Sequence, residues 1–147
     1  MKKKFFVIAL SLFALSNLVA CGSTSTSEFK DGSYSVETKN ADDHGYKAKL
    51  SIKVEDGKIT EANYNEFSAE TNELKRNDEG YNTKMTEVSG IGPADFEPQL
   101  EEALVKAQSA EIDVVTGATG SSEQFKTLAE KVLENAKEGV TEAALVD

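Results

Sequence analysis

The chain has 147 residues, 26 acidic against 16 basic side chains and a formal net charge of −10. A chain this acidic is repelled by nucleic acid and by anionic lipid headgroups, which argues against a nucleic-acid-binding function. Its single cysteine excludes an intrachain disulfide and a multi-cysteine metal site.

The first 20 residues have the pattern of a secretory signal. Lys2, Lys3 and Lys4 form a basic segment, and the apolar stretch FFVIALSLFAL that follows is too short for a stable membrane span. It leads to LVAC, which resembles the lipobox of bacterial lipoproteins; the alternative is an ordinary signal peptide that ends near a cysteine. By the resemblance, Cys21 receives a diacylglyceryl group and becomes the new N-terminus. The mature protein is then expected at the extracytoplasmic face of the cell membrane, held by its lipid.

Removal of residues 1–20 takes away three lysines and no acid, so the net charge falls from −10 to −13. Residues 21–28, which include GSTSTS, predict a flexible tether. Residues 29–147 are enough for one domain with a real core, and they contain no internal repeat. The cleaved leader is also a candidate signalling peptide, independent of the domain.

Alternating side chains predict three strands. GSYSVET reads as a short strand with Tyr34 and Val36 on one face. In the stretch 48–54, Ala, Leu, Ile and Val alternate with Lys and Ser, and Asp56-Gly57 then forms a type I′ hairpin turn. The return strand runs from Lys58 to about Phe67, and its imperfect alternation indicates a bulge near 60–62.

The polar stretch SAETNELKRNDEG predicts a loop. Helical spacing then predicts a short helix ending at Ser89-Gly90 and a longer one with Pro98 in its first turn. IDVV predicts a short buried strand or extended stretch, and a last helix ends at Gly139. The fold class is α+β, a small antiparallel sheet packed with helices. The apolar residues of the three helices are Tyr81, Met85 and Val88; Leu100, Ala103, Leu104 and Ala107; and Phe125, Leu128, Ala129, Val132, Leu133 and Ala136. Of these, Met85 and Leu100 are expected in the core rather than at a ligand.

The stretch DVVTGATGSS, residues 113–122, gathers small hydroxyl residues and glycines just before the last helix. Ser121 to Gln124 fits a capping box with Ser121 as the N-cap. Gly117 and Gly120 let the backbone approach a ligand closely, and the free N–H groups of a helix N-terminus favour a phosphate. An ordinary capped loop is the alternative. No lysine follows the glycines, so this is not a Walker-type loop.

DVVTGAT resembles the flavinylation motif D-x-x-[S/T]-G-A-T of FMN-binding domains. These domains occur in the sodium-pumping quinone reductase, in Rnf-type complexes and in extracellular electron-transfer lipoproteins of Gram-positive bacteria. The similarity extends over nearly the whole domain from Phe29. In that family a flavin transferase takes FMN from FAD and joins its phosphate to the hydroxyl of the final Thr. The resemblance implies that Thr119 carries FMN through a phosphoester bond, with Ser121 and Ser122 as alternative hydroxyls. The implied cofactor-binding residues are Thr119, Asp113, Thr116, Gly117, Ala118 and Ser121.

The sequence departs from the family in two places. Many members have a Gly/His-rich segment after the first strand and an acidic-Thr pair after the hairpin, whereas this chain has only DDHGY and SAET there. Tyr46, Glu70 and Thr71 are candidates to line the flavin. Asp113 belongs to the recognition motif and is expected also to bond backbone in the turn; a plain turn acid is the alternative. Thr116 is expected to bond the phosphate or the loop.

His44 is the only histidine, and it lies in an acidic loop that reads as surface rather than as a catalytic site. No catalytic residue and no metal site are predicted, since adjacent Asp42, Asp43 and His44 cannot easily point at one ion. The resemblance implies an electron-transfer carrier rather than a stand-alone enzyme, which passes electrons from a membrane quinone-linked donor to extracellular acceptors. The alternative is a non-redox lipoprotein that binds a phosphate-containing or flavin ligand reversibly.

Overall fold

Alternating apolar side chains build the hairpin of β2 (Tyr46–Glu55) and β3 (Lys58–Ser68) around the predicted turn. Both turn residues have positive φ, 51° at Asp56 and 70° at Gly57, as a type I′ turn requires. The inward side chains of β2 are buried and its outward lysines are not, which confirms the predicted strand. The structure is a computed structural model that describes residues 28–147, so the predicted signal peptide and nearly all of the predicted tether lie outside the described residues.

A bulge at Thr60 explains the imperfect alternation of β3. Lys53 pairs with Glu61 and Val54 with Ile59, so that Thr60 is an extra residue without a partner. The inward positions therefore change from odd to even numbers, and Tyr64 and Glu66 become buried. The bulge predicted near residues 60–62 is confirmed.

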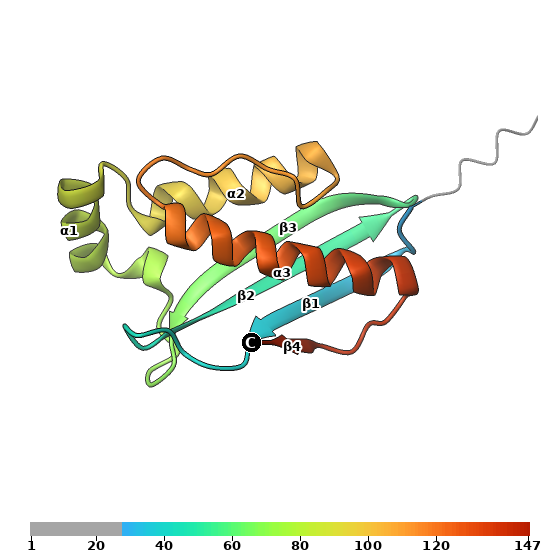
Figure 1. Cartoon of the computed structure of the whole chain (residues 1–147), viewed down its shortest axis with the longest axis horizontal. Coiled ribbons are helices and arrows are strands. Elements are labelled where there is room, and N and C mark those ends of the chain that lie inside the picture. The colour runs from blue at the N-terminus through green and yellow to red at the C-terminus, as the bar shows by residue number, and fades with distance from the viewer. Residues whose placement is uncertain (1–27) are drawn as a thin grey trace, which may run out of the picture.

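The hairpin is part of a four-stranded sheet in the order β3-β2-β1-β4 (Figure 1). β1 (Gly32–Thr38) is antiparallel to β2, as predicted, with Tyr34 and Val36 buried. β4 (Ala144–Val146) pairs with β1 in the parallel sense, and the sequence did not predict it. The α+β fold class and the single domain are confirmed.

The helix α3 (Thr119–Glu138) lies across the sheet in front of β1 and β2 and closes the core (Figure 1). All six residues of its predicted apolar stripe are buried. Gly139 ends the helix with φ 76°, as predicted. This helix face and the inward side chains of the strands together form the core.

The helix α2 (Pro93–Ala107) packs beside β3 and begins five residues earlier than a start at Pro98 would require. Pro93 occupies the first helical position, where a missing N–H costs nothing, and Pro98 lies inside the helix. The prediction that Pro98 belongs to the first turn is therefore wrong. Leu100 and Leu104 are buried as predicted, whereas Ala107 is exposed.

The short helix α1 (Glu79–Ser89) ends at Gly90 as predicted, but it has no buried residue. Asn82 holds it in place: its Nδ2 donates to the carbonyls of Lys75, Arg76 and Asp78, and its Oδ1 accepts from the N–H of Ala94. α1 is thus attached to the domain by these polar contacts and by the half-buried Met85, which packs against the core.

Two predicted irregular segments differ from expectation. The stretch SAETNELKRNDEG is not only a polar loop, because it contains the 3₁₀-helix η1 (Lys75–Asn77) and Lys75 is buried. IDVV is extended without strand pairing, and only its Ile112 is buried. Among residues 28–147, no helix is both long and apolar enough to cross a membrane.

Candidate functional site

The motif stretch 113–122 leads directly into α3, whose first residue is Thr119. The N-cap is Ala118, and no side chain caps it, so the predicted capping box with Ser121 as N-cap is wrong. The helix starts three residues earlier than that pattern implies. Thr119 and Ser121 consequently both belong to the first turn.

Ser122 fixes the motif loop to the helix. Its buried hydroxyl accepts a hydrogen bond from the N–H of Val115 (3.0 Å) and donates one to the carbonyl of Ala118 (2.8 Å). Both polar functions of the hydroxyl are therefore used inside the protein. Ser122 positions the loop and is not a free hydroxyl for modification.

The surroundings of Thr119 fit a phosphate. Thr119 is exposed, and the first N–H of α3 with a helical partner is that of Ser122, so the three preceding N–H groups point out of the helix end. No acidic residue lies in the first turn of α3. A Cβ added at Gly120 would meet nothing within 4 Å. The positive end of a 20-residue helix is thus open to an anion beside the Thr119 hydroxyl.

Gly117 provides the tight backbone turn that the sequence predicted. Its φ is 86°, and a Cβ at this position would lie 2.3 Å from the carbonyl oxygen of Ser89. The close approach that Gly117 permits is therefore with the end of α1. Ala118 is buried in the core, so its small side chain serves packing at the helix start. Together these two residues seat the motif loop against α1.

A cavity of about 500 Å³ lies along α1 and is lined by two tyrosines, apolar side chains and two basic residues. Its volume is within the range of small-molecule sites. The rings of Tyr46 and Tyr81 meet edge to face, with centroids 5.6 Å apart. Such a surface suits a flat aromatic ligand. The lining residues are His44, Tyr46, Tyr81, Lys84, Met85, Val88 and Ser89.

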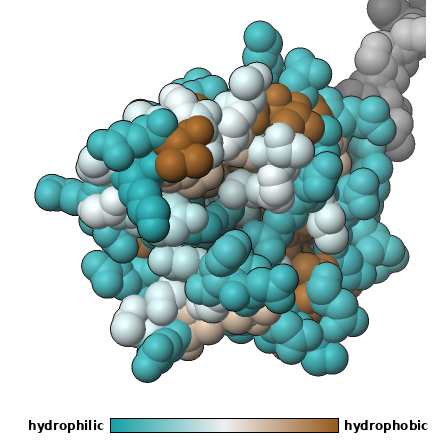
Figure 2. All heavy atoms as spheres, turned by 60° about the vertical axis from the view of Figure 1, so that its left-hand side comes forward, coloured by the Kyte–Doolittle hydropathy of each residue, from teal (hydrophilic) through white to brown (hydrophobic). Residues whose placement is uncertain are grey.

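Ser89 joins this cavity to the motif, because it lines the cavity and also touches Gly117. Figure 1 shows α1 and the start of α3 at the same end of the domain. Figure 2 brings that end forward, and apolar side chains reach the surface there in separate places among hydrophilic ones. Val88 is 79% exposed at the cavity. Met85, expected in the core, is half-buried: it packs against the core and also lines the cavity, whereas Leu100 is fully buried in the core as predicted.

The first half of the motif lines a second cavity, of about 730 Å³, beside α2. Asp113 and Thr116 are both exposed there. Within residues 28–147 the Asp113 carboxylate makes no hydrogen bond, so the expected bond to the turn backbone is not observed. Glu70 and Thr71, candidates to line the flavin, are exposed in the turn after β3 and line neither cavity. Tyr46 lies in the first cavity, as proposed from the sequence.

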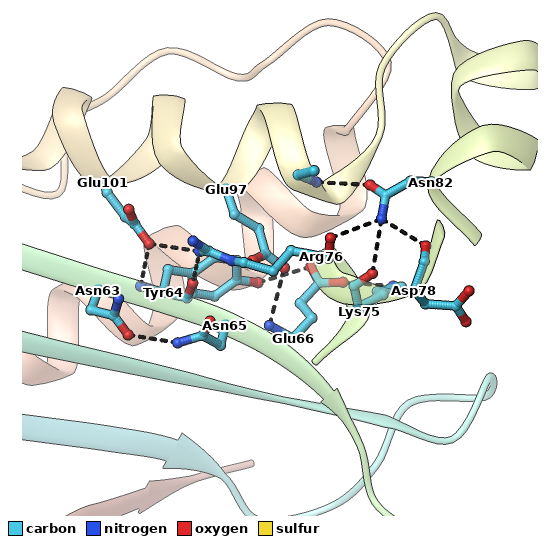
Figure 3. A network of polar contacts seen from close by, with 11 residues as sticks. Asn63, Tyr64, Asn65, Glu66, Lys75, Arg76, Asp78, Asn82, Glu97 and Glu101 are labelled. Atoms are coloured by element: carbon cyan, nitrogen blue, oxygen red, sulfur yellow. Dashed lines mark hydrogen bonds and ion pairs between the residues drawn. The ribbon is translucent and has the colours of Figure 1, made fainter. Parts of the chain in front are cut away.

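Sequence reasoning missed a buried ionic network behind the first cavity (Figure 3). Lys75 pairs with Glu66 at 2.6 Å, and both side chains are almost fully buried. Arg76 pairs with Glu97 and with Glu101, the latter at 2.7 Å. The signal was present in the pattern, because the alternation of β3 after the bulge turns Glu66 inward. The apolar stripe of α2 likewise includes Glu97.

Burial changes the ionisation of this network. Burial raises the pKa of Glu97 to about 7, although the Arg76 guanidinium acts in the opposite direction. Burial also raises the pKa of Tyr64, whose hydroxyl donates to Glu66 at 3.0 Å. Burial alone lowers the pKa of Lys75, but the ion pair with Glu66 outweighs it and the net pKa is raised. The raised pKa favours the charged form of Lys75.

The chain resembles known proteins in both sequence and structure. The family model described as "FMN-binding domain" matches residues 44–134. The "15 kDa lipoprotein" of Treponema pallidum (strain Nichols) is 34% identical over 134 residues, which cover 90% of this chain and 94% of that protein. The crystal structure of CPE2226 protein from Clostridium perfringens is 73% identical with a TM-score of 0.80, and the match covers 81% of this chain and 98% of that one.

Proposed function

The chain belongs to the FMN-binding domain family, and from this premise we propose that it is a lipid-anchored flavoprotein with FMN joined through a phosphoester to Thr119. The observation that carries the proposal is the exposed Thr119 in the first turn of α3. Its hydroxyl stands beside three free backbone N–H groups, with no carboxylate in the same turn to repel a phosphate.

The attachment is a phosphoryl transfer from FAD, carried out by a separate flavin transferase. The diphosphate bond of FAD breaks, AMP leaves, and the Thr119 oxygen loses its proton and receives the FMN phosphoryl group. A threonine hydroxyl is a poor nucleophile, so the enzyme must activate it. Asp113 and Thr116 are exposed along the second cavity and thus accessible to this enzyme, while Gly117 and Ser122 hold the loop in its shape.

The flavin ring is proposed to lie in the cavity lined by Tyr46, Tyr81 and Met85. This cavity adjoins the motif through Ser89, and the apolar residues Met85 and Val88 of α1 line it. A flat ring would cover these residues and exclude water from them. Bound FMN supplies one- and two-electron redox chemistry, and the protein orients it and sets its electrostatic environment.

The proposed role is electron transfer at the extracytoplasmic face of the cell membrane. Cys21 would carry the diacylglyceryl anchor, and the 34% identity to a protein named as a lipoprotein supports this. Electrons would come from a membrane quinone-linked donor and leave to extracellular acceptors. The exposed cavity rim at Val88 leaves the ring close to solvent and to a partner.

The decisive test is the intact mass of the domain, produced together with a flavin transferase, for the wild type and three single variants. We expect an added FMN-phosphoester mass in the wild type, in Thr116→Ala at reduced yield, and in Ser121→Ala. Thr119→Ala should lack it. Mass retained in Thr119→Ala but lost in Ser121→Ala would move the attachment to Ser121. No added mass in any protein would favour reversible binding of a flavin or phosphate ligand.

The anchor and the electron transfer need their own measurements. Cys21→Ser should release the protein from the membrane fraction, whereas the wild type should remain with it. Under anaerobic conditions, membranes supplied with a quinol should bleach the flavin absorbance of the loaded wild type. Loaded protein that stays oxidised under these conditions would exclude a quinone-linked donor.

A further inference from the structure

Lys75 places a buried positive charge directly behind the aromatic wall of the first cavity. Its Nζ lies 4.5 Å from the ring centroid of Tyr46 and 4.8 Å from that of Tyr81. Both rings line the cavity, and the Lys75 side chain itself is only 7% exposed. The two rings thus separate the ammonium group from the space where the flavin ring is proposed to lie.

The negative partner of Lys75 lies on the core side. Glu66 of β3 accepts from Nζ at 2.6 Å, and the Tyr64 hydroxyl donates to the same carboxylate, as Figure 3 shows. The ion pair therefore has its positive end at the tyrosines and its negative end in the sheet. Because it is shielded from water, its field is screened less than that of a surface pair.

A reduced flavin ring interacts with this field differently from an oxidised one. When the ring takes up two electrons and one proton, it gains one negative charge. A cation within a few ångströms favours the charged form of a group over the neutral form, by about 10- to 1000-fold in the equilibrium. Lys75 lies behind the tyrosine rings and is therefore farther from the flavin than in such close pairs, and Glu66 offsets part of its field, so we expect the lower end of that range.

We propose that Lys75, held between Tyr46 and Tyr81 by Glu66, is a tuning residue that shifts the bound FMN toward its reduced state. The inference rests on the flavin seat proposed above. It assigns a function to a buried charge of a kind that apolar residues can often replace without loss of stability. The chain has a net charge of −10, so the positive charge of Lys75 acts against the negative electrostatic field of the protein as a whole.

The test is the midpoint potential of the FMN-loaded protein, measured by spectroelectrochemistry at fixed pH. The double variant Lys75→Met/Glu66→Gln removes both charges and leaves no unpaired ion in the core. We expect its equilibrium between reduced and oxidised flavin to fall about tenfold, which is about 30 mV for a two-electron couple. Lys75→Arg should stay close to the wild type. Lys131→Met/Glu134→Gln, which removes an exposed ion pair from the surface of α3, is the matched control.

A second double variant, Lys75→Gln/Glu66→Gln, keeps a polar link and serves if the first does not fold. An unchanged potential in a folded, FMN-loaded double variant would overturn the tuning role alone. An equal shift in Lys131→Met/Glu134→Gln would also overturn it, because the shift would then not depend on the position of Lys75 behind the tyrosines. If the wild type takes up no FMN, covalently or reversibly, the proposed function fails and this inference fails with it.

Discussion

Gln108 pairs with Ile59 through both ends of its side-chain amide. The N–H of Ile59 donates to Oε1 (2.8 Å), and Nε2 donates to the carbonyl of Ile59 (2.9 Å). A side chain just after α2 thus imitates a neighbouring strand on the open edge of β3. Glu101 and Glu97 accept from the next inward amides of the same edge, those of Tyr64 and Glu66. The edge that could pair with another chain is therefore occupied from within.

Gln108→Ala should lower the free energy of unfolding by about 1–3 kcal/mol, because two hydrogen bonds to a part-buried strand edge are lost. Urea unfolding followed by circular dichroism measures this. Gln99→Ala, an exposed glutamine of the same helix, is the matched control and should change the value by less than about 0.5 kcal/mol. Equal effects of the two substitutions would remove the special role of Gln108.

Glu97 should make the stability fall as the pH rises from 4.5 to about 7. In this window the folded chain keeps a proton on Glu97 that the unfolded chain has released, since burial raises the pKa from 4.5 to about 7. The loss should total about 3 kcal/mol and should level off above pH 7. Urea unfolding across this range tests it. Glu97→Gln stays neutral and should lack this part of the slope; parallel curves for the two proteins would contradict the assignment.

Gly117→Ala should destabilise the domain by more than about 1 kcal/mol, because alanine is strained at φ 86° and its Cβ would collide with the Ser89 carbonyl. Gly120→Ala is the control within the same stretch, since its Cβ meets nothing. It lies in the first turn of α3 and should leave stability unchanged or raise it by up to about 1 kcal/mol. Thermal unfolding of both variants decides between a loop shaped by packing and one kept small for a ligand.

Ser122→Ala should cost about 1–3 kcal/mol, because the buried N–H of Val115 and the Ala118 carbonyl both lose the hydroxyl. Ser121→Ala changes the neighbouring hydroxyl, for which the described residues give no hydrogen bond, and should cost less than about 0.5 kcal/mol. Chemical unfolding of the two variants is the measurement. A larger cost for Ser121→Ala would show that the motif loop is held in another way.

Local sequence patterns predicted the strands and the last helix, because each of these elements is determined by its contact with one neighbouring surface. The alternation in β2, the Asp56-Gly57 turn and the stripe of α3 each report burial against one neighbouring surface. β4 has only three residues, and its pairing with β1 depends on the return path of the chain after α3. No periodicity within three residues can reveal such a pairing.

Residues of the candidate site were predictable where a sequence motif or resemblance marks them. They were not predictable where contacts between different elements place them. Thr119 lies at the helix start near which the motif placed it, and Tyr46 lines a cavity beside it. Lys75 reads as a surface lysine in a polar run, because its partner Glu66 belongs to another element. Ser121 looked like the N-cap, yet the bonds of Ser122 let the helix begin at Thr119.

The helix α3 separates the two ends of the molecule that matter for the proposed carrier. The N–H of Lys30 donates to the carbonyl of Ala136 (2.9 Å), so the described chain enters beside the C-terminal end of α3. Thr119 begins the same helix 17 positions earlier, about 25 Å along its axis. With an anchor at Cys21, the domain would be attached at the end near Lys30 and would carry its flavin at the opposite end. Tilting the whole body would then carry the flavin toward or away from the membrane without any change inside the fold.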